Sequence, residues 1–365
     1  MSRSEACAKI NEALVAFFGN VPELCVPYGN GHINDTFLVT AEKRYILQRM
    51  NDTVFPHPDE MMENILGITE HIRQKAAQRG EDTGRATLVV LPTREGTPYF
   101  RDSIGSWWRL YEFTEGTVTR EAVECAQDFY TCAEAFGRFQ QELSDYPAEK
   151  LHETIENFHN TPWRFENLRR AVEKDACGRA GEVQAEIDFA MAREEFAGTL
   201  DRAYRAGALP LRVTHNDTKL NNILFDATTG LPVCVVDLDT VMPGFSVTDF
   251  GDSIRFGANT AAEDETDLSK VSLDLELFRV YAEGFLKGCG GRLTETEIDL
   301  LPVGAMMMTF ECGMRFLTDY LEGDVYFKIH RPGHNLDRCR NQFALVADME
   351  KKLPAMNAII EKLKG

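Results

Sequence analysis

The sequence predicts an α+β protein with two lobes, an N-terminal lobe built on an antiparallel sheet and a larger helical C-terminal lobe. In the first third of the chain, β-branched and aromatic residues alternate in short runs, as they do in strands. In most of the remainder, hydrophobic residues recur every three or four positions, as in amphipathic helices. The 365 residues, of which 44% are hydrophobic, suffice for two cores. We therefore expect lobes at 1–111 and 112–365.

The N-terminal lobe contains three segments with the composition of strands, at 36–50, 86–91 and 97–113. Glycine, asparagine and proline separate them, which favours antiparallel connections. A helix is predicted between the first two segments, at 59–79, because its hydrophobic residues follow three- and four-residue steps. These residues are Met62, Ile65, Ile68, Ile72 and Ala76.

The C-terminal lobe is predicted to be mostly helical from about Glu121 onward. Helical spacing is clearest at 133–143, 187–205, 273–288 and 295–321. Three short apolar runs, at 211–214, 222–225 and 233–238, interrupt this pattern and are separated by polar turns. We interpret them as strand-like hairpins within the helical lobe, where they would present the polar turns as a functional site.

The composition excludes several classes of function. The chain has 58 Asp and Glu residues against 39 Lys and Arg residues, and its net charge of -19 would repel nucleic acid. It has no apolar stretch near the roughly 18 residues that a membrane helix needs, and no signal-peptide pattern over residues 1–20. The nine cysteines are scattered without a C-x-x-C pair, which favours reduced thiols. We expect a cytoplasmic monomer that binds neither nucleic acid nor membrane.

The segment VTHNDTKLNNILF, at 213–225, carries the strongest motif in the chain. His215 and Asn216 precede Asp217, Asn222 follows Asp217 by five positions, and Asp237 comes 20 positions after Asp217 at the end of an apolar run. The first spacing is that of the kinase catalytic loop, and the later acidic residue stands where a magnesium ligand is needed. Turn capping would explain each residue alone, but not their joint spacing.

The chemistry of phosphoryl transfer requires this set of side chains. A carboxylate must orient the attacking hydroxyl and accept its proton, a role that we assign to Asp217. Magnesium takes hard oxygen ligands, which Asn222 and Asp237 would supply. Asp239 would add a further ligand, since on an extended strand it faces the same side as Asp237. Lys219 is predicted to act as a cation for the transferred phosphoryl group.

A second motif, Asp249-Phe250-Gly251, has the letters of the kinase D-F-G sequence. It lies 32 positions after Asp217, too far for the magnesium role, so Asp237 is the better candidate ligand. Asp249 is predicted to tie the loop to the helical lobe by hydrogen bonds. Asp252 and Arg255 either share this structural role or contact the substrate.

A glycine-containing segment, YGNGHINDT at 28–36, precedes a predicted strand. Gly29 and Gly31 would allow backbone N–H groups to approach phosphate oxygens. A plain hairpin turn is the alternative, and the downstream catalytic loop favours phosphate binding, with His32 and Asn34 in the same segment.

At these motifs the chain resembles the aminoglycoside phosphotransferase and choline kinase superfamily, which has the protein-kinase fold and phosphorylates small-molecule alcohols. Segments such as YGNGHINDTFLVT, LRVTHNDTKLNNIL, VDLDTVMPG and ECGMRFLTDYLEGDVYF are similar to those of the bacterial N-acetylhexosamine 1-kinases. The resemblance covers about residues 20–345. It implies transfer of the ATP γ-phosphate to the anomeric hydroxyl of N-acetylglucosamine or N-acetylgalactosamine, with Mg²⁺ and ATP as cofactors.

Carried over residue by residue, the resemblance gives the N-terminal lobe a nucleotide-binding role and the C-terminal lobe catalysis and sugar binding. It makes Asp217 the base, and the segment 108–113 the hinge that contacts adenine. The implied nucleotide-binding set is Gly29, Gly31, His32, Asn34, Ile46, Gln48, Tyr111 and Phe113. Arg315 and Tyr326 would hold the sugar, against the alternatives of a helix ion pair between Arg315 and Asp319 and a core position for Tyr326.

The chain departs from the wider fold at Gln48, where kinases carry a lysine. The residue that steadies the α- and β-phosphates therefore stays open. Two other functions also stay open: a kinase of another small alcohol, such as choline, an amino alcohol or an aminoglycoside, and a catalytically silent nucleotide-binding regulator. The presence of Asp217, Asn222 and Asp237 argues against the regulator.

Overall fold

The computed structural model describes residues 3–29, 33–120, 123 and 125–364. The chain forms two compact units. The first, here the sheet unit, comprises Met1–Thr119, Glu149–Glu156 and Ile223–Met242. The second, here the helical unit, comprises Arg120–Ala148, Asn157–Asn222 and Pro243–Gly365. The division that we predict after residue 111 cuts the chain once, whereas these two units interleave along it.

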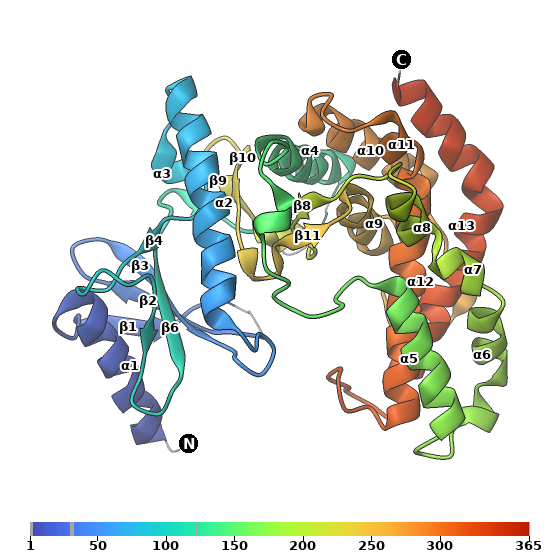
Figure 1. Ribbon diagram of the computed structural model, residues 1–365, viewed down its shortest axis with the longest axis horizontal. Coiled ribbons are helices and arrows are strands. Elements are labelled where there is room, and N and C mark those ends of the chain that lie inside the picture. Colours follow the sequence, from blue (N-terminus) through green and yellow to red (C-terminus); the bar gives the residue numbers. More distant parts are fainter. Residues whose placement is uncertain (1–2, 30–32, 121–122, 124, 365) are drawn as a thin grey trace. The chain divides into compact units, whose positions relative to one another are not determined.

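The sheet unit is built on an antiparallel sheet with the strand order β1-β2-β3-β6-β4, and β5 pairs with β6 (Figure 1). The strands are β1 (Leu24–Pro27), β2 (Asp35–Thr40), β3 (Arg44–Met50), β4 (Val90–Leu91), β5 (Phe100–Arg101) and β6 (Trp107–Glu112). The predicted strand segments are confirmed, and β1 is an additional strand. In the register, Gln48 on β3 lies opposite both Thr36 on β2 and Arg109 on β6.

The two faces of this sheet have different chemistry because side chains alternate along each strand. One face carries Val39, Leu47, Trp108 and Leu110, which pack with residues of helix α1 (Arg3–Phe18) in one core. The residues between them along the strands face the other way. That opposite face therefore carries the polar side chains of Gln48 and Arg109.

Helix α2 (Pro58–Arg79) confirms the helix predicted at 59–79. All five of its predicted core residues are buried, and the helix ends at Gly80, whose φ of 72° is left-handed. Helix α3 (Thr83–Ala86) follows. Helix α2 packs against the short 3₁₀ turn η4 (Leu238–Thr240), and Asn64 of α2 donates hydrogen bonds to the carbonyls of Val241 and His152. The helix thus joins three separate segments of the sheet unit.

The hairpin expected within the helical lobe belongs instead to the sheet unit. Strands β9 (Ile223–Asp226) and β10 (Pro232–Val235) form a three-stranded antiparallel sheet with β7 (Thr117–Val118). The hairpin takes its third strand from a segment far earlier in the sequence, because β9 forms backbone hydrogen bonds with β7. The run predicted as a strand at 233–238 also ends early, since Asp237 has a left-handed φ of 58° and η4 follows it.

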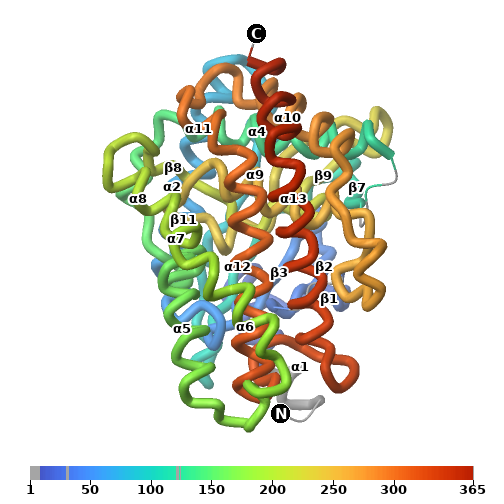
Figure 2. The backbone as a smooth tube through the Cα atoms, turned by 90° about the vertical axis from the view of Figure 1, so that its right-hand side faces the viewer, coloured from blue at the N-terminus to red at the C-terminus, as the bar shows by residue number. Residues whose placement is uncertain are grey.

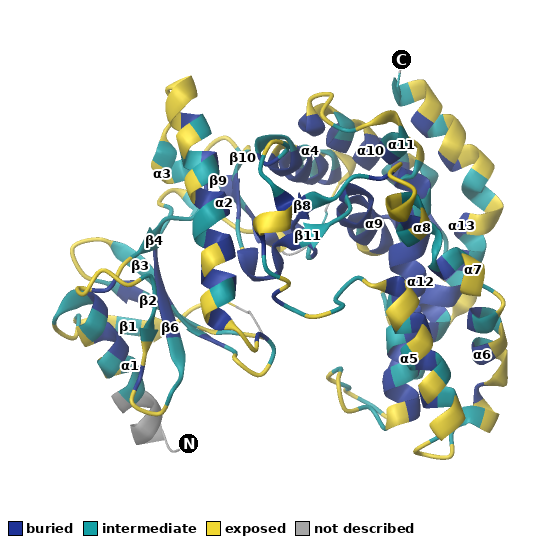
Figure 3. Cartoon of the chain, viewed as in Figure 1, coloured by how far each residue is buried: buried dark blue, intermediate teal, exposed yellow. Residues whose placement is uncertain are grey.

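The helical unit is organised around α12 (Leu301–Glu322), which is buried along most of its length (Figure 3). It packs against α5 (Thr161–Lys174), α9 (Ser246–Gly257) and α13 (His334–Lys364), and Figure 2 shows α12 and α13 running side by side. The remaining helices are α4 (Ala126–Glu142), α6 (Gln184–Met191), α7 (Glu194–Ala197), α8 (Thr199–Arg205), α10 (Leu275–Cys289) and α11 (Glu295–Asp299). Short 3₁₀ turns are η1 (Ala148–Lys150), η2 (Ala180–Glu182), η3 (Leu220–Asn222) and η5 (Leu268–Lys270).

The four helical segments predicted in this part of the chain are confirmed, with breaks at 192–193, 198 and 300. Helices α1, α3, α5, α9 and α13 lie outside the predicted helical segments. Strand β8 (Arg212–Thr214) pairs with β11 (Met242–Gly244). Among the described residues, no helix combines the length and the apolar character needed to cross a membrane.

Candidate functional site

The loop that follows β8 is held in place by Asp249 on α9. The backbone N–H groups of His215 and Asn216 donate to the Asp249 carboxylate at 2.8 Å each, and the Gln140 side chain on α4 donates to it at 2.8 Å. Asp249 is only 2% exposed. Its carboxylate thus fixes the entry to the loop, and the prediction that Asp249 ties the loop to the helices is confirmed.

Both carboxylate oxygens of Asp217 contact side chains of the same loop. The Lys219 Nζ atom lies 2.5 Å from Oδ1, and the Asn222 amide nitrogen donates to the Asp217 carbonyl at 2.8 Å and to Oδ2 at 3.1 Å. Burial disfavours the charged form of Lys219, but the Asp217 charge outweighs this effect and raises the lysine pKa. The Asn222 amide nitrogen is thus engaged with Asp217, and neither of these bonds uses the amide oxygen.

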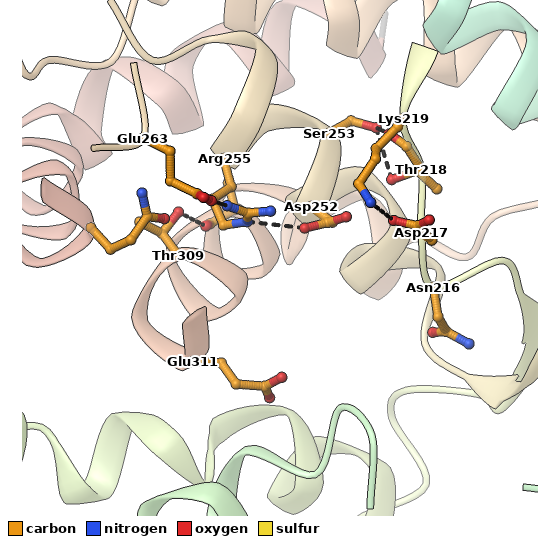
Figure 4. A network of polar contacts seen from close by, with 12 residues as sticks. Asn216, Asp217, Thr218, Lys219, Asp252, Ser253, Arg255, Glu263, Thr309 and Glu311 are labelled. Atoms are coloured by element: carbon orange, nitrogen blue, oxygen red, sulfur yellow. Dashed lines mark hydrogen bonds and ion pairs between the residues drawn. The ribbon is translucent and has the colours of Figure 1, made fainter. Parts of the chain in front are cut away.

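Asp252 lies next to this pair on the helical unit (Figure 4). Its carboxylate accepts from Arg255 at 3.0 Å, and Arg255 also donates to Glu263 at 2.7 Å. Burial raises the pKa of the Asp252 carboxyl, but Arg255 and the nearby His159 and Lys219 outweigh it, so that the pKa is lowered. Asp252 and Arg255 thus form a buried ion pair within α9 that extends to Glu263, and a substrate contact at these residues stays a prediction.

Arg315 on α12 has an unusual environment for an arginine. Within the described residues it makes no hydrogen bond or ion pair, and three aromatic rings surround its guanidinium: Phe158, Phe327 and Tyr326, with centroids at 5.5, 5.4 and 5.9 Å. Its neighbours in the sequence, Met314 and Leu317, are fully buried. Arg315 thus projects from a core helix without a hydrogen bond or ion pair to a described residue, and its charge helps to lower the pKa of Glu311 one turn earlier.

The two alternatives for the predicted sugar-binding residues are wrong. Asp319 does not pair with Arg315, because its carboxylate accepts the backbone N–H groups of residues 325–327 at 2.7 to 2.9 Å. These bonds fix the loop after α12. Tyr326 is 65% exposed on that loop, which excludes a core position.

The sheet unit brings Asp239 and Arg109 together as a buried ion pair. Two guanidinium nitrogens of Arg109 reach the two Asp239 oxygens at 2.6 and 2.9 Å, and these side chains are 1% and 4% exposed. Asn34 donates to the same carboxylate at 2.7 Å. The Arg109 Nε atom donates to Gln48 at 2.9 Å, and Gln48 in turn donates to Thr36 at 3.0 Å.

This arrangement corrects the premise on which Asp239 was predicted as a metal ligand. The two aspartates do not lie on an extended strand, because Asp237 is left-handed and Asp239 lies in the 3₁₀ turn η4. Asp239 points to Arg109 and Asn34 instead. Its role toward a metal stays a prediction.

The other predicted nucleotide-binding residues lie around the polar face of the sheet. Ile46 is directly opposite Tyr111 in the register, and Tyr111 is 4% exposed with no hydrogen-bond partner for its hydroxyl among the described residues. Phe113 follows β6, where the Arg44 guanidinium lies 4.1 Å from its ring centroid. Gly29 has a left-handed φ of 76°. Gly31 and His32 lie outside the described residues.

A family model described as "Phosphotransferase enzyme family" matches residues 25–281, which is more than half of the chain. The chain belongs to this family. The resemblance of its motifs to the phosphotransferases is thereby confirmed at the level of the family, and the fold agrees with it.

Three solved structures illustrate the similarity of fold. The microcompartment-associated aminopropanol kinase matches this phosphotransferase with a TM-score of 0.62 at 16% identity, over 96% of this chain and 98% of that chain. An aminoglycoside phosphotransferase from Alicyclobacillus acidocaldarius subsp. acidocaldarius DSM 446 gives 0.61 at 13%, over 97% and 96%. The GDP complex of aminoglycoside 2'-phosphotransferase-IIIa gives 0.58 at 13%, over 94% and 99%. The predicted kinase-like α+β fold is confirmed.

The donor chemistry of this phosphotransferase fits magnesium. Asp237 offers a carboxylate from a left-handed turn, and Asn222 offers the amide oxygen that its bonds to Asp217 leave available. Hard oxygen donors of this kind are the ligands that magnesium takes in sites completed by substrate phosphates and water.

Sequence reasoning missed two residues of the phosphotransferase site, His159 and Arg109. His159 contacts Glu311 at 2.8 Å and the Asn216 carbonyl at 3.4 Å, so it links the catalytic loop to α12. Burial raises the pKa of Glu311, but His159, Arg315 and Thr161 together outweigh burial and lower the pKa. His159 belongs to none of the motifs described above, and Arg109 lies in the segment 108–113, to which the resemblance assigned only the adenine contact. Only for Arg109 was there a signal, since a charged residue in a hydrophobic strand calls for a buried partner.

Proposed function

We propose that this phosphotransferase transfers the γ-phosphate of ATP to the anomeric hydroxyl of an N-acetylhexosamine. One observation carries the choice of acceptor: the Arg315 guanidinium lies among three aromatic rings and makes no hydrogen bond or ion pair with a described residue. A fixed positive charge repels an ammonium group, whereas its N–H groups can donate to hydroxyl and acetyl oxygens. The rings suit the apolar face of a sugar. The resemblance of the surrounding segment to the N-acetylhexosamine 1-kinases supports the same acceptor.

In this proposal the catalytic loop prepares the acceptor hydroxyl. Asp217 accepts the proton from the anomeric hydroxyl, and Asn222 and Lys219 hold its carboxylate in one orientation. Asn222 and Asp237 hold magnesium, which neutralises charge on the phosphates when it is bound. Lys219 then exchanges its contact with Asp217 for the transferred phosphoryl group.

The sheet unit binds the nucleotide in this proposal. Ile46, Tyr111 and Phe113 contact the adenine, and the buried Tyr111 hydroxyl offers a donor that no described residue uses. Gly29 and its neighbours in the glycine-containing segment approach the phosphates. On the helical unit, Arg315 and Tyr326 hold the sugar, while Asp252, held by Arg255, accepts a sugar hydroxyl.

One observation favours a second candidate, a kinase of an amino alcohol. The net charge of -19 would draw a cationic substrate toward the protein. This field acts on the rate of encounter, whereas Arg315 acts at short range, where discrimination between acceptors is decided. We therefore rank the sugar first.

The test incubates the protein with Mg-ATP and separate acceptors: N-acetylglucosamine, N-acetylgalactosamine, aminopropanol, choline and an aminoglycoside. Phosphorus NMR then locates the new phosphate ester. We expect a sugar 1-phosphate with at least one N-acetylhexosamine and little product with the cationic acceptors. Product from a cationic acceptor alone would support the second candidate. Absence of any product, with nucleotide binding retained, would support the silent regulator.

A further inference from the structure

The sheet unit carries a positive charge in the place where a kinase lysine is missing. Gln48 stands at the lysine position of β3, and Arg109 lies directly opposite it on β6. Directly opposite residues of an antiparallel pair have Cβ atoms about 4.5–5.5 Å apart, so both side chains reach the same space. The hydrogen bond of 2.9 Å from Arg109 Nε to Gln48 shows that they do.

We propose that Arg109 is a positioning residue that replaces the missing lysine by fixing the turn that carries Asp237. This inference rests on the proposed role of Asp237 as a magnesium ligand. Arg109 acts through Asp239, with which it forms the paired contacts at 2.6 and 2.9 Å. In the guanidinium fork, Nη2 donates a hydrogen bond to Oδ2, and the Nη1–Oδ1 contact is an ion pair without hydrogen-bond geometry. Together the two contacts fix the position of the carboxylate.

Asp239 holds the turn through Oδ2 and its carbonyl, which accept hydrogen bonds, whereas Oδ1 makes only the ion-pair contact with Arg109. Besides the two contacts to Arg109, Asn34 donates to the carboxylate at 2.7 Å and the Thr154 hydroxyl donates to the Asp239 carbonyl at 2.8 Å. Asp239 is thereby tied to three segments of the sheet unit that are far apart in sequence. Asp237, two residues earlier, has a left-handed φ of 58° that needs such support.

The pair also decides how much negative charge the turn presents. Asp237 and Asp239 would repel each other if neither carboxylate were neutralised, and Asp239 would compete with Asp237 as a metal ligand. Arg109 neutralises Asp239 and thereby reduces both effects. The lysine of other kinases acts on the phosphates from β3. Here Arg109 acts from β6 on the turn that carries Asp237 and Asp239.

The test separates positioning from simple stability by removing both charges at once. Removing Arg109 alone leaves a buried carboxylate unpaired and lowers stability strongly, whereas replacing both members of a buried pair with uncharged residues often preserves it. We therefore compare Arg109→Met/Asp239→Asn with the wild type. The measurements are the melting temperature and nucleotide affinity by calorimetry, with Mg²⁺ and with EDTA, in the absence of acceptor.

We expect the double variant to melt near the wild-type temperature. The gain in nucleotide affinity that Mg²⁺ provides should be about 10- to 100-fold smaller, which is the usual effect of removing an outer partner of a metal ligand. Affinity in EDTA should change little. Arg109→Lys should lose less of the Mg²⁺ effect than Arg109→Met/Asp239→Asn, because it keeps the charge without the fork. If the double variant does not fold, Arg109→Lys decides by the same measurement against wild type.

The matched control is Arg212→Met/Glu297→Gln, which removes another buried ion pair, with a contact of 2.7 Å in the helical unit. Its Mg²⁺ effect should equal that of the wild type. The inference is overturned if the double variant keeps the full Mg²⁺ effect, or if Arg109→Lys keeps it where the double variant does not fold. The proposed function would still stand in that case. A wild-type protein whose nucleotide affinity does not depend on Mg²⁺ would overturn both.

Discussion

Aspartates that look alike in the sequence meet different surroundings in the structure. Asp217 contacts Lys219 and Asn222 on the catalytic loop and keeps a quarter of its side-chain surface accessible. Asp249 is almost fully buried and accepts hydrogen bonds from the loop backbone. The same substitution at the two positions should therefore affect two different properties, turnover and stability.

Asp217→Asn should keep the fold and slow turnover by roughly 10² to 10⁴, the usual contribution of a positioned base. Asp249→Asn should instead lower the free energy of unfolding by several kcal/mol, at about 1–3 kcal/mol for each buried donor left unsatisfied. Steady-state kinetics and chemical denaturation of both variants check this. Less than about a fivefold loss of turnover in a folded Asp217→Asn protein would remove Asp217 from its role.

Arg315→Ala should raise the KM for the N-acetylhexosamine and leave the KM for ATP nearly unchanged. Loss of a charged hydrogen bond costs about 1.5–3 kcal/mol, or roughly ten- to a hundredfold in kcat/KM for the sugar. The melting temperature should hardly change, because Arg315 has no ion pair within the described residues. Arg205→Ala, which removes an exposed ion pair with Asp201, is the control. An unchanged sugar KM would make Arg315 a structural residue.

At the scale of elements, the catalytic loop depends on how closely two helices approach. Helix α4 supplies Gln140, which donates to Asp249, and α4 packs lengthwise on α10. Glycines make this approach possible: a Cβ at Gly137 would lie 2.3 Å from the Phe285 carbonyl, and one at Gly288 would lie 2.4 Å from the Glu134 carbonyl. Backbone atoms on both helices line this contact, so side-chain movement cannot relieve a larger residue.

Gly137→Ala should therefore lower the free energy of unfolding by at least about 1–3 kcal/mol, the usual cost of overpacking, although alanine is the better helix former. Gly181→Ala is the control, since an added Cβ there meets no atom within 4 Å. It should change stability by less than about 0.5 kcal/mol. Urea denaturation of both variants measures the difference. Equal free energies of unfolding for Gly137→Ala and Gly181→Ala would mean that α4 and α10 can move apart without cost.

At the scale of the whole molecule, the buried acids of the helical unit make stability depend on pH. Burial is the largest single influence and raises the pKa of Glu297, but the hydrogen bonds from Arg212, Thr294 and Ser246 and the charge of Arg212 together hold the pKa below its ordinary value of 4.5. The pKa values of Asp252 and Glu311 are also lowered, with Arg255 and His159 as the respective main opposing charges. A carboxyl with a lowered pKa binds fewer protons in the folded state than in the unfolded state. Its contribution is therefore full above the ordinary pKa and is lost as the pH falls through the folded value.

The melting temperature should accordingly hold near neutral pH and fall steeply below about pH 4.5. Glu297→Gln should melt at a lower temperature than wild type at pH 7. Its melting temperature should fall less between about pH 5 and pH 3, because glutamine takes up no proton when the protein unfolds. Calorimetric scans across this range check both expectations. Parallel pH profiles for the two proteins would show that Glu297 does not contribute to acid unfolding.

How much the sequence predicts depends on how locally a feature is encoded. The helix α2 and the strands of the first sheet follow from periodicity over neighbouring residues, and so do the catalytic loop and its spacing to Asp237. The hairpin of β9 and β10 was assigned to the wrong part of the fold, because the composition of a strand does not say which distant strand it pairs with. The extended-strand geometry predicted for Asp237 and Asp239 was wrong for a similar reason, since Asp237 has a left-handed φ and Asp239 lies in a 3₁₀ turn.

The sequence by itself determined the class of chemistry, because the acids and the amide of a phosphotransferase stand at set intervals along one stretch of chain. The tertiary structure alone decided which partners these groups have. The pairing of Arg109 with Asp239 depends on the register of β3 against β6 and on the turn after β10, and the contact of His159 with Glu311 depends on α12. Such contacts join residues 130 and 152 positions apart. They form only when strand hydrogen bonding and core packing have placed both segments. The spacing of residues along the chain therefore does not predict them.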